Sequence, residues 1–319
     1  MRNRIMRNLH LLRYARIIAL LGGGIPLSQP IAAQQLGSLE PRALPPLTHP
    51  NSPSVPAKLL FGRETAPARM PSLPIGFYAH GCLAGGVALP LSGPDWQVMR
   101  PSRDRYWGHP ELIAFIEHFA KKVTRVSHWP GLLIGDMAQP RGGPMLNGHA
   151  SHQIGLDVDI WLRPMPSRLL SRREREDMLS LNLVRPDRLD VDPRTWTSDD
   201  FAVLKAAAQE PEVQRIFVNA AIKKAMCREA GNRGAWLAKL RPMYGHNYHF
   251  HVRLFCPKGD RSCEGQIPVP KEEGCDRASL AYWFSDRVLH PRPAPHPKPR
   301  RWLMLADLPA TCRNVLSAK

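Results

Sequence analysis

The 319-residue sequence has no apolar run as long as a membrane-spanning helix needs, about 20 residues. The apolar stretch near its start extends only from Ile17 to about Leu27 and contains Pro26. Five arginines and no acidic residue precede this stretch, and the segment QPIAAQQ follows it. This order is typical of a secretory signal peptide, which we expect to be residues 1–33. The mature chain is then expected to have no membrane span.

Acidic residues are outnumbered: 27 Asp and Glu stand against 44 Lys and Arg, which gives a formal charge of +17. A basic chain can bind nucleic acid, but no basic segment here is interleaved with aromatic residues as in nucleic-acid-binding motifs. The expected export of the chain argues further against a nucleic-acid partner. We therefore expect no nucleic-acid partner. The sequence also lacks an internal repeat.

Cysteine is present in an even number, and all six residues follow the expected signal peptide. An even count in an exported chain predicts disulfides formed in an oxidising compartment. Six cysteines allow fifteen pairings, so the sequence alone leaves the connectivity open. Cys256 and Cys263 flank the turn-rich segment PKGDRS, which makes them the natural local pair.

Proline-rich segments frame the middle of the chain. Residues 34–74 have little periodicity, so we expect an extended connector there. Residues 75–288 have the length of one domain. Residues 289–319 form a proline-rich basic tail, and Cys312 within it predicts that this tail is tied back to the domain.

Helical and alternating segments follow one another in the domain without a regular βαβ order. Helical spacing of apolar residues predicts helices over 109–123, 199–209 and 221–231. Strands are predicted in GLLIGDM (131–137), LDVDIWL (156–162) and YHFHVRLF (248–255), whereas RIFVN (215–219) fits a strand or a helix. This mixture predicts an α+β fold with a small antiparallel sheet flanked by helices.

Two aspartates, Asp157 and Asp159, interrupt the apolar alternation of a strand that is expected to be buried. Burying a carboxylate is costly unless other groups compensate for its lost hydration. A hydrogen-bond network, a salt bridge, for example to Arg253, or a metal ion could do so.

Five of the thirteen histidines form two groups, His149 with His152 and then His246, His249 and His251. Because strand side chains alternate, Asp159 and His251 can each project from one face of a strand. With His152 they would supply two nitrogens and one oxygen, a set that suits Zn²⁺. Three protein ligands leave the fourth position open, as in catalytic zinc sites. A solvated histidine face, with carboxylates balanced by arginine, is the alternative.

The segments GHASHQIGLDVDIW (148–161) and HFHVRL (249–254) resemble those of the penicillin-insensitive murein endopeptidases. These are zinc peptidases of the group that also contains bacterial D-Ala-D-Ala peptidases and Hedgehog-type domains. The segments GCLAGGVALP, YWGHPELIAFI, LIGDM and RIFVNAAIK resemble the same family in the same order. The resemblance extends roughly from Phe77 to Cys275, with Cys312 in the expected place.

The resemblance implies a zinc ion held by His152, Asp159 and His251, with His149 as a further metal-associated residue. The metal interpretation of the two histidine groups itself assigns Asp157 to orienting a ligand histidine from behind the metal. The resemblance gives His246 and His249 roles in proton transfer or oxyanion stabilisation. A second family metal position uses an Asp and a His. Here Asp187 matches the first, but Asp190 occupies the place of the histidine, and a carboxylate can still bind a metal.

The resemblance further implies the disulfides Cys82–Cys312, Cys227–Cys275 and Cys256–Cys263. It implies hydrolysis of the D-alanyl–meso-diaminopimelyl cross-link of peptidoglycan in the periplasm. Two other functions stay open: a D,D-carboxypeptidase with the same zinc chemistry, and a non-catalytic wall-binding protein with a structural zinc. The sequence does not determine the oligomeric state, and a homodimer is one option.

Overall fold

The computed structural model describes residues 36–41, 43–231, 234–292 and 301–319. The expected signal peptide, 1–33, lies outside these ranges, and so does most of the proline-rich segment 291–299. Within the described ranges, no helix combines the length and apolarity that crossing a membrane requires.

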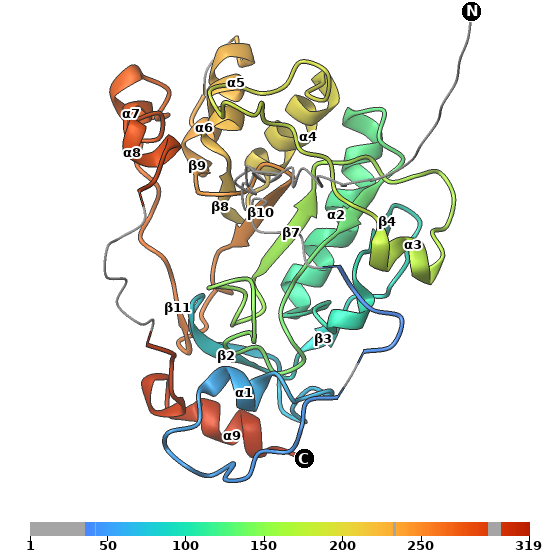
Figure 1. The fold of residues 1–319 in the computed structure, drawn as a ribbon, viewed down its shortest axis with the longest axis vertical. Coiled ribbons are helices and arrows are strands. Elements are labelled where there is room, and N and C mark those ends of the chain that lie inside the picture. Colours follow the sequence, from blue (N-terminus) through green and yellow to red (C-terminus); the bar gives the residue numbers. More distant parts are fainter. Residues whose placement is uncertain (1–35, 42, 232–233, 293–300) are drawn as a thin grey trace, which may run out of the picture. The chain divides into compact units, whose positions relative to one another are not determined.

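A six-stranded sheet with the order β4-β6-β7-β10-β8-β9 forms the centre of the fold (Figure 1). Its inner strands pair antiparallel, whereas β4 and β9 run parallel to their neighbours. The α+β class is confirmed, but the sheet is larger than expected and mixed. Its edge strands have three residues each, too few for an alternating pattern to reveal them. In this order, the strands are β4 (Trp96–Val98), β6 (Leu132–Ile134), β7 (Asp157–Trp161), β10 (His249–Leu254), β8 (Val213–Val218) and β9 (Leu240–Pro242).

Helices cover one face of this sheet. The long helix α2 begins with Pro110 at its first position, and the side chain of His109 accepts a hydrogen bond from the Glu111 amide. Its apolar face packs with the inward side chains Val158 and Phe250 into the main core. Helix α4 packs against both α2 and β8. The helices that contribute to this core are α2 (Pro110–Val126), α4 (Ser198–Gln209), α5 (Ala220–Glu229) and α6 (Trp236–Lys239), whereas α3 (Arg172–Asp177) packs against the 3₁₀ turn η1 (Pro101–Arg103).

A second sheet of order β11-β1-β2 has its own small core. Its strands are β11 (Cys263–Glu264), β1 (Leu73–Phe77) and β2 (His80–Ala84). Helix α9 (Thr311–Ser317) packs against β2. The segment expected to be an extended connector contains helix α1 (Ala57–Phe61), whose end residues Ala57 and Phe61 are buried in this core. One helical turn is too short to produce a recognisable period.

Short elements complete the described structure. Strands β3 (Val87–Ala88) and β5 (Trp107–Gly108) pair with each other. The 3₁₀ turn η1 (Pro101–Arg103) precedes β5. Helices α7 (Arg277–Ala281) and α8 (Asp286–Leu289) and the 3₁₀ turn η2 (Leu305–Asp307) follow later in the chain.

Three disulfides include all six cysteines, and their partners are those implied by the family resemblance. Cys82–Cys312 joins β2 to α9 across 230 residues and lies in the second core. Cys227–Cys275 and Cys256–Cys263 close loops of 48 and 7 residues. The C-terminal segment is thus tied to the domain, because its helix is covalently joined to β2.

The glycine-rich loop between β6 and β7 carries two histidines of the candidate site. Gly142 has φ +60°, and a β-carbon there would lie 2.0 Å from the carbonyl oxygen of Gln153, so only glycine fits. His152 itself has φ 68°, a left-handed conformation that is uncommon for residues other than glycine. These left-handed backbone conformations turn the loop tightly before β7 begins at Asp157.

Candidate metal centre

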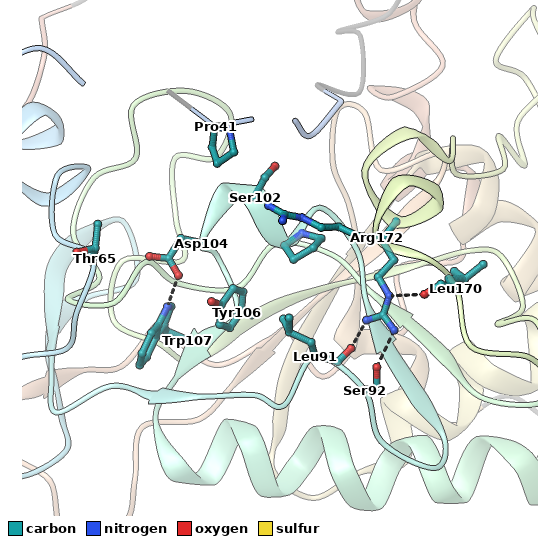
Figure 2. A pocket seen from close by; sticks show the side chains of 12 residues that line it. Pro41, Thr65, Leu91, Ser92, Ser102, Asp104, Tyr106, Trp107, Leu170 and Arg172 are labelled. Carbon is teal, nitrogen blue, oxygen red and sulfur yellow. Dashed lines mark hydrogen bonds between the residues drawn. The ribbon is translucent and has the colours of Figure 1, made fainter. Parts of the chain in front are cut away.

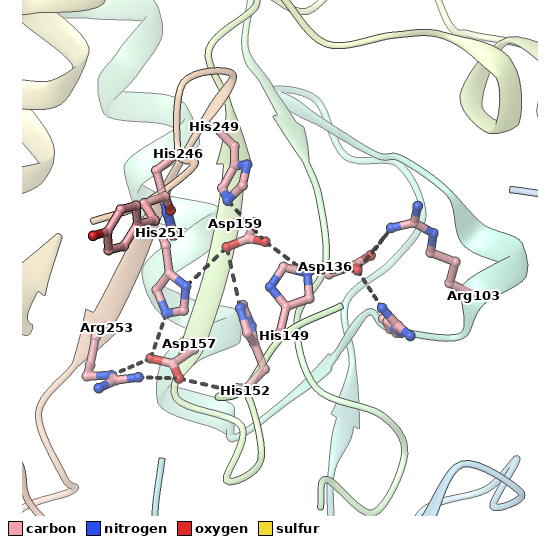
Figure 3. Close-up of polar contacts among 12 residues, drawn as sticks. Arg103, Asp136, His149, His152, Asp157, Asp159, His246, His249, His251 and Arg253 are labelled. Carbon is pink, nitrogen blue, oxygen red and sulfur yellow. Dashed lines mark hydrogen bonds and ion pairs between the residues drawn. The ribbon is translucent and has the colours of Figure 1, made fainter. Parts of the chain in front are cut away.

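The register between β7 and β10 brings the charged residues of the two strands together. His251 lies opposite Asp159, and Arg253 lies opposite Asp157. All four side chains are buried on the sheet face away from the main core, where they point toward one another (Figure 3). The alternation predicted from the sequence is therefore present, but both faces of these strands are covered.

Asp157 has a complete set of partners. Its oxygens accept hydrogen bonds from Nε and Nη2 of Arg253 at 2.8 and 3.0 Å, and from the backbone amide of His152 at 3.0 Å. Nε2 of His251 lies 3.1 Å from Oδ1. Burial alone would raise the pKa of Asp157, but Arg253 and His251 hold it well below its usual range. A salt bridge thus compensates the first of the two aspartates.

Asp159 is surrounded by imidazoles and, among the residues that the structure describes, has no guanidinium partner. Its Oδ1 lies 3.3 Å from Nδ1 of His251 and 3.4 Å from Nε2 of His152. Its Oδ2 lies 3.4 Å from Nε2 of His149 and 3.6 Å from Nε2 of His249. Although burial raises the pKa of Asp159, His249, His149 and His152 together hold it well below 3.8.

Several of these atoms are buried without a hydrogen bond. Within the described part of the chain, both ring nitrogens of His152, Oδ1 of Asp159 and Nε2 of His249 have none. Buried polar atoms are rarely left unpaired, so such a group needs an explanation. One ligand atom from each of His149, His152 and Asp159 lies within 4.8 Å of the others, close enough for one ion to contact all three. This donor set of imidazole nitrogens and a carboxylate oxygen fits zinc.

His251 is oriented from behind. Its Nε2 faces Asp157 and its Nδ1 faces Asp159, at 3.1 and 3.3 Å. Burial lowers the pKa of His251, but the two carboxylates outweigh it, Asp157 more than Asp159, and raise the pKa to about 9. A proton on the nitrogen that faces Asp157 leaves Nδ1 as the atom available to a metal, the usual carboxylate–histidine–metal arrangement.

His246 and His249 lie side by side at the end of β10, with ring centroids 4.8 Å apart. His246 has φ 52°, and its Nδ1 lies 2.8 Å from the carbonyl oxygen of Tyr244. Burial, together with the neighbouring histidines, lowers the pKa of His249 to about 4 and that of His246 to about 3. Both rings are therefore neutral at pH 7 and can accept a proton.

Asp187 and Asp190 do not belong to this group of close ligand atoms in the described structure. Asp187 is exposed and pairs with Arg185. Asp190 lies 2.9 Å from Nη1 of Arg228 and 3.1 Å from Nζ of Lys224, both on α5. The structure thus gives each carboxylate a basic partner, and a second metal position that uses them stays a prediction.

Asp136 belongs to the centre, although the sequence analysis gave it no role. Its Oδ2 lies 3.1 Å from Nε2 of His149, 2.8 Å from Nη1 of Arg105 and 3.0 Å from Nη1 of Arg103. Its backbone carbonyl accepts a hydrogen bond from the amide of Asp159. The available signal was the segment LIGDM, in which a carboxylate directly follows a short buried strand.

Buried histidines gathered around one carboxylate provide the donor set of a metalloenzyme centre on an α+β domain. The family model described as penicillin-insensitive murein endopeptidase matches residues 74–317. This chain belongs to that family and is a peptidase.

Three relatives are described as penicillin-insensitive murein endopeptidase. That of Haemophilus influenzae is 43% identical over 245 residues, 77% of this chain and 82% of its own. That of Klebsiella pneumoniae is 42% identical over 245 residues, 76% of this chain and 85% of its own. That of Pectobacterium atrosepticum is 44% identical over 213 residues, which are 67% of this chain and 75% of its own. The family and the disulfides together fit an extracytoplasmic protein.

Proposed function

We propose that this protein is a zinc-dependent endopeptidase of the periplasm that hydrolyses the D-alanyl–meso-diaminopimelyl cross-link of peptidoglycan. The observation that carries the proposal is the set of unpaired buried atoms around Asp159, in a chain whose relatives are described as murein endopeptidases. We expect one zinc ion per chain. A homodimer stays a prediction.

His152, Asp159 and His251 would hold the zinc ion, with His149 beside them. When bound, zinc supplies Lewis acidity, which activates water at neutral pH and polarises the scissile carbonyl group. Asp157 fixes both the backbone of His152 and the ring of His251, so that two of the three ligands are oriented by one carboxylate. Arg253 in turn keeps Asp157 ionised.

His249 is the best placed general base. Its buried Nε2 has no hydrogen-bond partner and faces the carboxylate of Asp159 at 3.6 Å. Because burial lowers its pKa, the ring is neutral at pH 7, which is the form that can accept a proton from water and return it to the leaving amine. The ring of His246 lies next to that of His249, with the two centroids 4.8 Å apart. A proton on Nδ1, toward the Tyr244 carbonyl, would leave its Nε2 as an acceptor.

This chemistry accounts for the insensitivity to penicillin in the family description. β-Lactams inactivate serine peptidases by acylating the nucleophilic hydroxyl group. A site in which water is the nucleophile forms no acyl-enzyme, so the drug has no group to acylate. The proposed reaction is therefore expected to proceed unchanged in the presence of penicillin.

Mass analysis of the products from purified cross-linked muropeptide dimers tests the proposal. Zinc-loaded protein should convert each dimer into two monomers and add one water molecule, with or without penicillin. Release of a terminal D-alanine with the cross-link intact would identify a carboxypeptidase instead. Tight binding to cell-wall sacculi without any cleavage would identify a non-catalytic wall-binding protein.

A further inference from the structure

A pocket of about 660 Å³ lies next to the segment that joins η1 to β5 (Figure 2). Its volume falls within the range of small-molecule sites, about 300–1,000 Å³. The proposed reaction does not use it. Its walls include the aromatic residues Tyr106 and Trp107, the carboxylate of Asp104 and the guanidinium of Arg172.

The same segment connects this pocket to the metal centre. Ser102, Asp104 and Tyr106 line the pocket, whereas Arg103 and Arg105, the residues between them, reach Asp136. Successive side chains of this stretch therefore serve two neighbouring sites. A ligand bound in the pocket would lie on the other side of one chain segment from the candidate metal centre.

The pocket offers an aromatic surface beside a fixed carboxylate. The rings of Tyr106 and Trp107 are stacked, with centroids 5.8 Å apart and planes 20° from parallel, and both are half-buried. Nε1 of Trp107 donates to Oδ1 of Asp104 at 2.8 Å. This bond and the stacking of the two rings hold the aromatic pair and the carboxylate in one arrangement before any ligand binds.

The pocket also has a free donor. Arg175 lines the wall, but its guanidinium already donates to Ser92, Gln97 and the carbonyl of Leu170. Arg172 is exposed, and the described structure gives it no hydrogen bond or ion pair. Its guanidinium can therefore donate to a ligand without breaking an existing contact.

We propose that this pocket binds an N-acetylated sugar of the murein glycan strand and so holds the polymer beside the peptidase centre. A pyranose ring has an apolar C–H face, which suits the aromatic pair, and hydroxyl groups, which need the donor and the acceptor at Arg172 and Asp104. The acetamido group adds a methyl that suits the apolar wall. This proposal rests on the proposed function, since murein joins its stem peptides to such a strand.

Binding of a peptide-free probe gives the first test. The β-1,4-linked N-acetylglucosamine tetramer is titrated into the full zinc-loaded protein by calorimetry. Leu91→Trp should fill the pocket, because Leu91 lines it and is 41% exposed, and Arg172→Ala removes the free donor. Each should lower the association constant at least tenfold. Arg173→Ala is the matched control, because this neighbouring arginine lies on the same helix and does not line the pocket.

Cleavage of two substrates gives the second test. With cross-linked glycan chains, Leu91→Trp and Arg172→Ala should raise KM about tenfold and leave kcat unchanged. With peptide dimers stripped of glycan, both variants should match the unaltered protein. Absence of tetramer binding, or equal losses on the two substrates, would overturn the proposal, since equal losses would assign the pocket to the peptide. If the unaltered protein cleaves neither substrate, the proposed function fails, while the tetramer titration still decides the sugar site.

Discussion

Oδ1 of Asp159 lies 3.3 Å from Nδ1 of His251, its direct partner across the β7–β10 ladder. Two residue pairs further along, Asp157 meets Arg253. Two adjacent carboxylates on one strand face thus receive different compensation. Asp157 has a guanidinium, whereas the described residues around Asp159 are imidazoles, and the nitrogens of His152 and His249 that face it have no hydrogen bond there. Because Arg253 already balances the charge of Asp157, we assign the metal to Asp159.

Replacing His152, Asp159 or His251 by Ala should each remove the zinc ion, because each loses one of three proposed ligands. Elemental analysis of the purified variants measures this directly. His128→Ala is the control, since His128 is exposed, pairs with Asp199 and belongs to neither group of close ligand atoms in the described structure. Full zinc retention in all three ligand variants would contradict the assignment. A second equivalent of metal that disappears in Asp187→Ala would show that the other family position is occupied.

Asp136→Asn should weaken zinc binding about 10–100-fold, because it removes the charge that orients His149 while keeping the shape of the side chain. Competition with a chromogenic chelator measures the affinity, and a thermal melt shows whether the fold is retained. Asp199→Asn is a matched change, since Asp199 also pairs with a histidine, the exposed His128. Equal affinities in the two variants would show that Asp136 does not act on the metal.

His249→Ala should lower kcat for cross-link hydrolysis by about 10²–10⁴-fold while zinc stays bound, as expected for loss of a proton-transfer group. His246→Ala serves as the comparison, because the ring of His246 lies next to that of His249. If only His246→Ala silences the enzyme, the base is His246. Near-normal turnover in both zinc-loaded variants would exclude both residues.

Replacing Cys82 and Cys312 together by Ala should lower the free energy of unfolding by about 2–5 kcal/mol, since this bridge closes a loop of 230 residues. Chemical denaturation of both proteins gives the difference. The Cys256–Cys263 bridge spans only 7 residues, so its removal should cost less. The opposite ranking would show that native packing around the bridges, and not loop length, sets their contribution.

Stability should rise with pH between about 7 and 10.5 because of Lys223. This side chain is 1% exposed and donates to the carbonyls of Leu237 and Glu273. Burial lowers the pKa of Lys223 from 10.5 to about 7 in the folded protein. Within that window the unfolded chain binds more protons than the folded one, so raising the pH favours folding, and the cost of the buried charge is fully present below pH 7.

Urea unfolding of the unaltered protein and of Lys223→Met across this pH range measures the effect. The difference in unfolding free energy between the two proteins should change with pH, because Met cannot titrate. A constant difference from pH 6.5 to 10 would mean that Lys223 stays charged in the folded state.

Local patterns in the sequence were sufficient for the longer elements and for the candidate histidines and aspartates of β7, β10 and the loop before β7. The alternation of LDVDIWL and HFHVRL placed Asp157, Asp159, His249 and His251 on strand faces, since side-chain direction has a period of two whatever the partner strand. The apolar spacing of α2 is equally local. The even number of cysteines in an exported chain predicted disulfides, and the family resemblance supplied their pairing.

Only the tertiary structure decided which of these residues meet. The register of β7 against β10 determines that Arg253 neutralises Asp157 and that His251 faces Asp159, and a shift of one residue would have reversed both faces. Asp136 and its two arginines come together from separate segments, so no spacing in the sequence reveals them. A strand pattern fixes the direction of a side chain, but its charge environment depends on neighbours that folding brings from elsewhere in the chain.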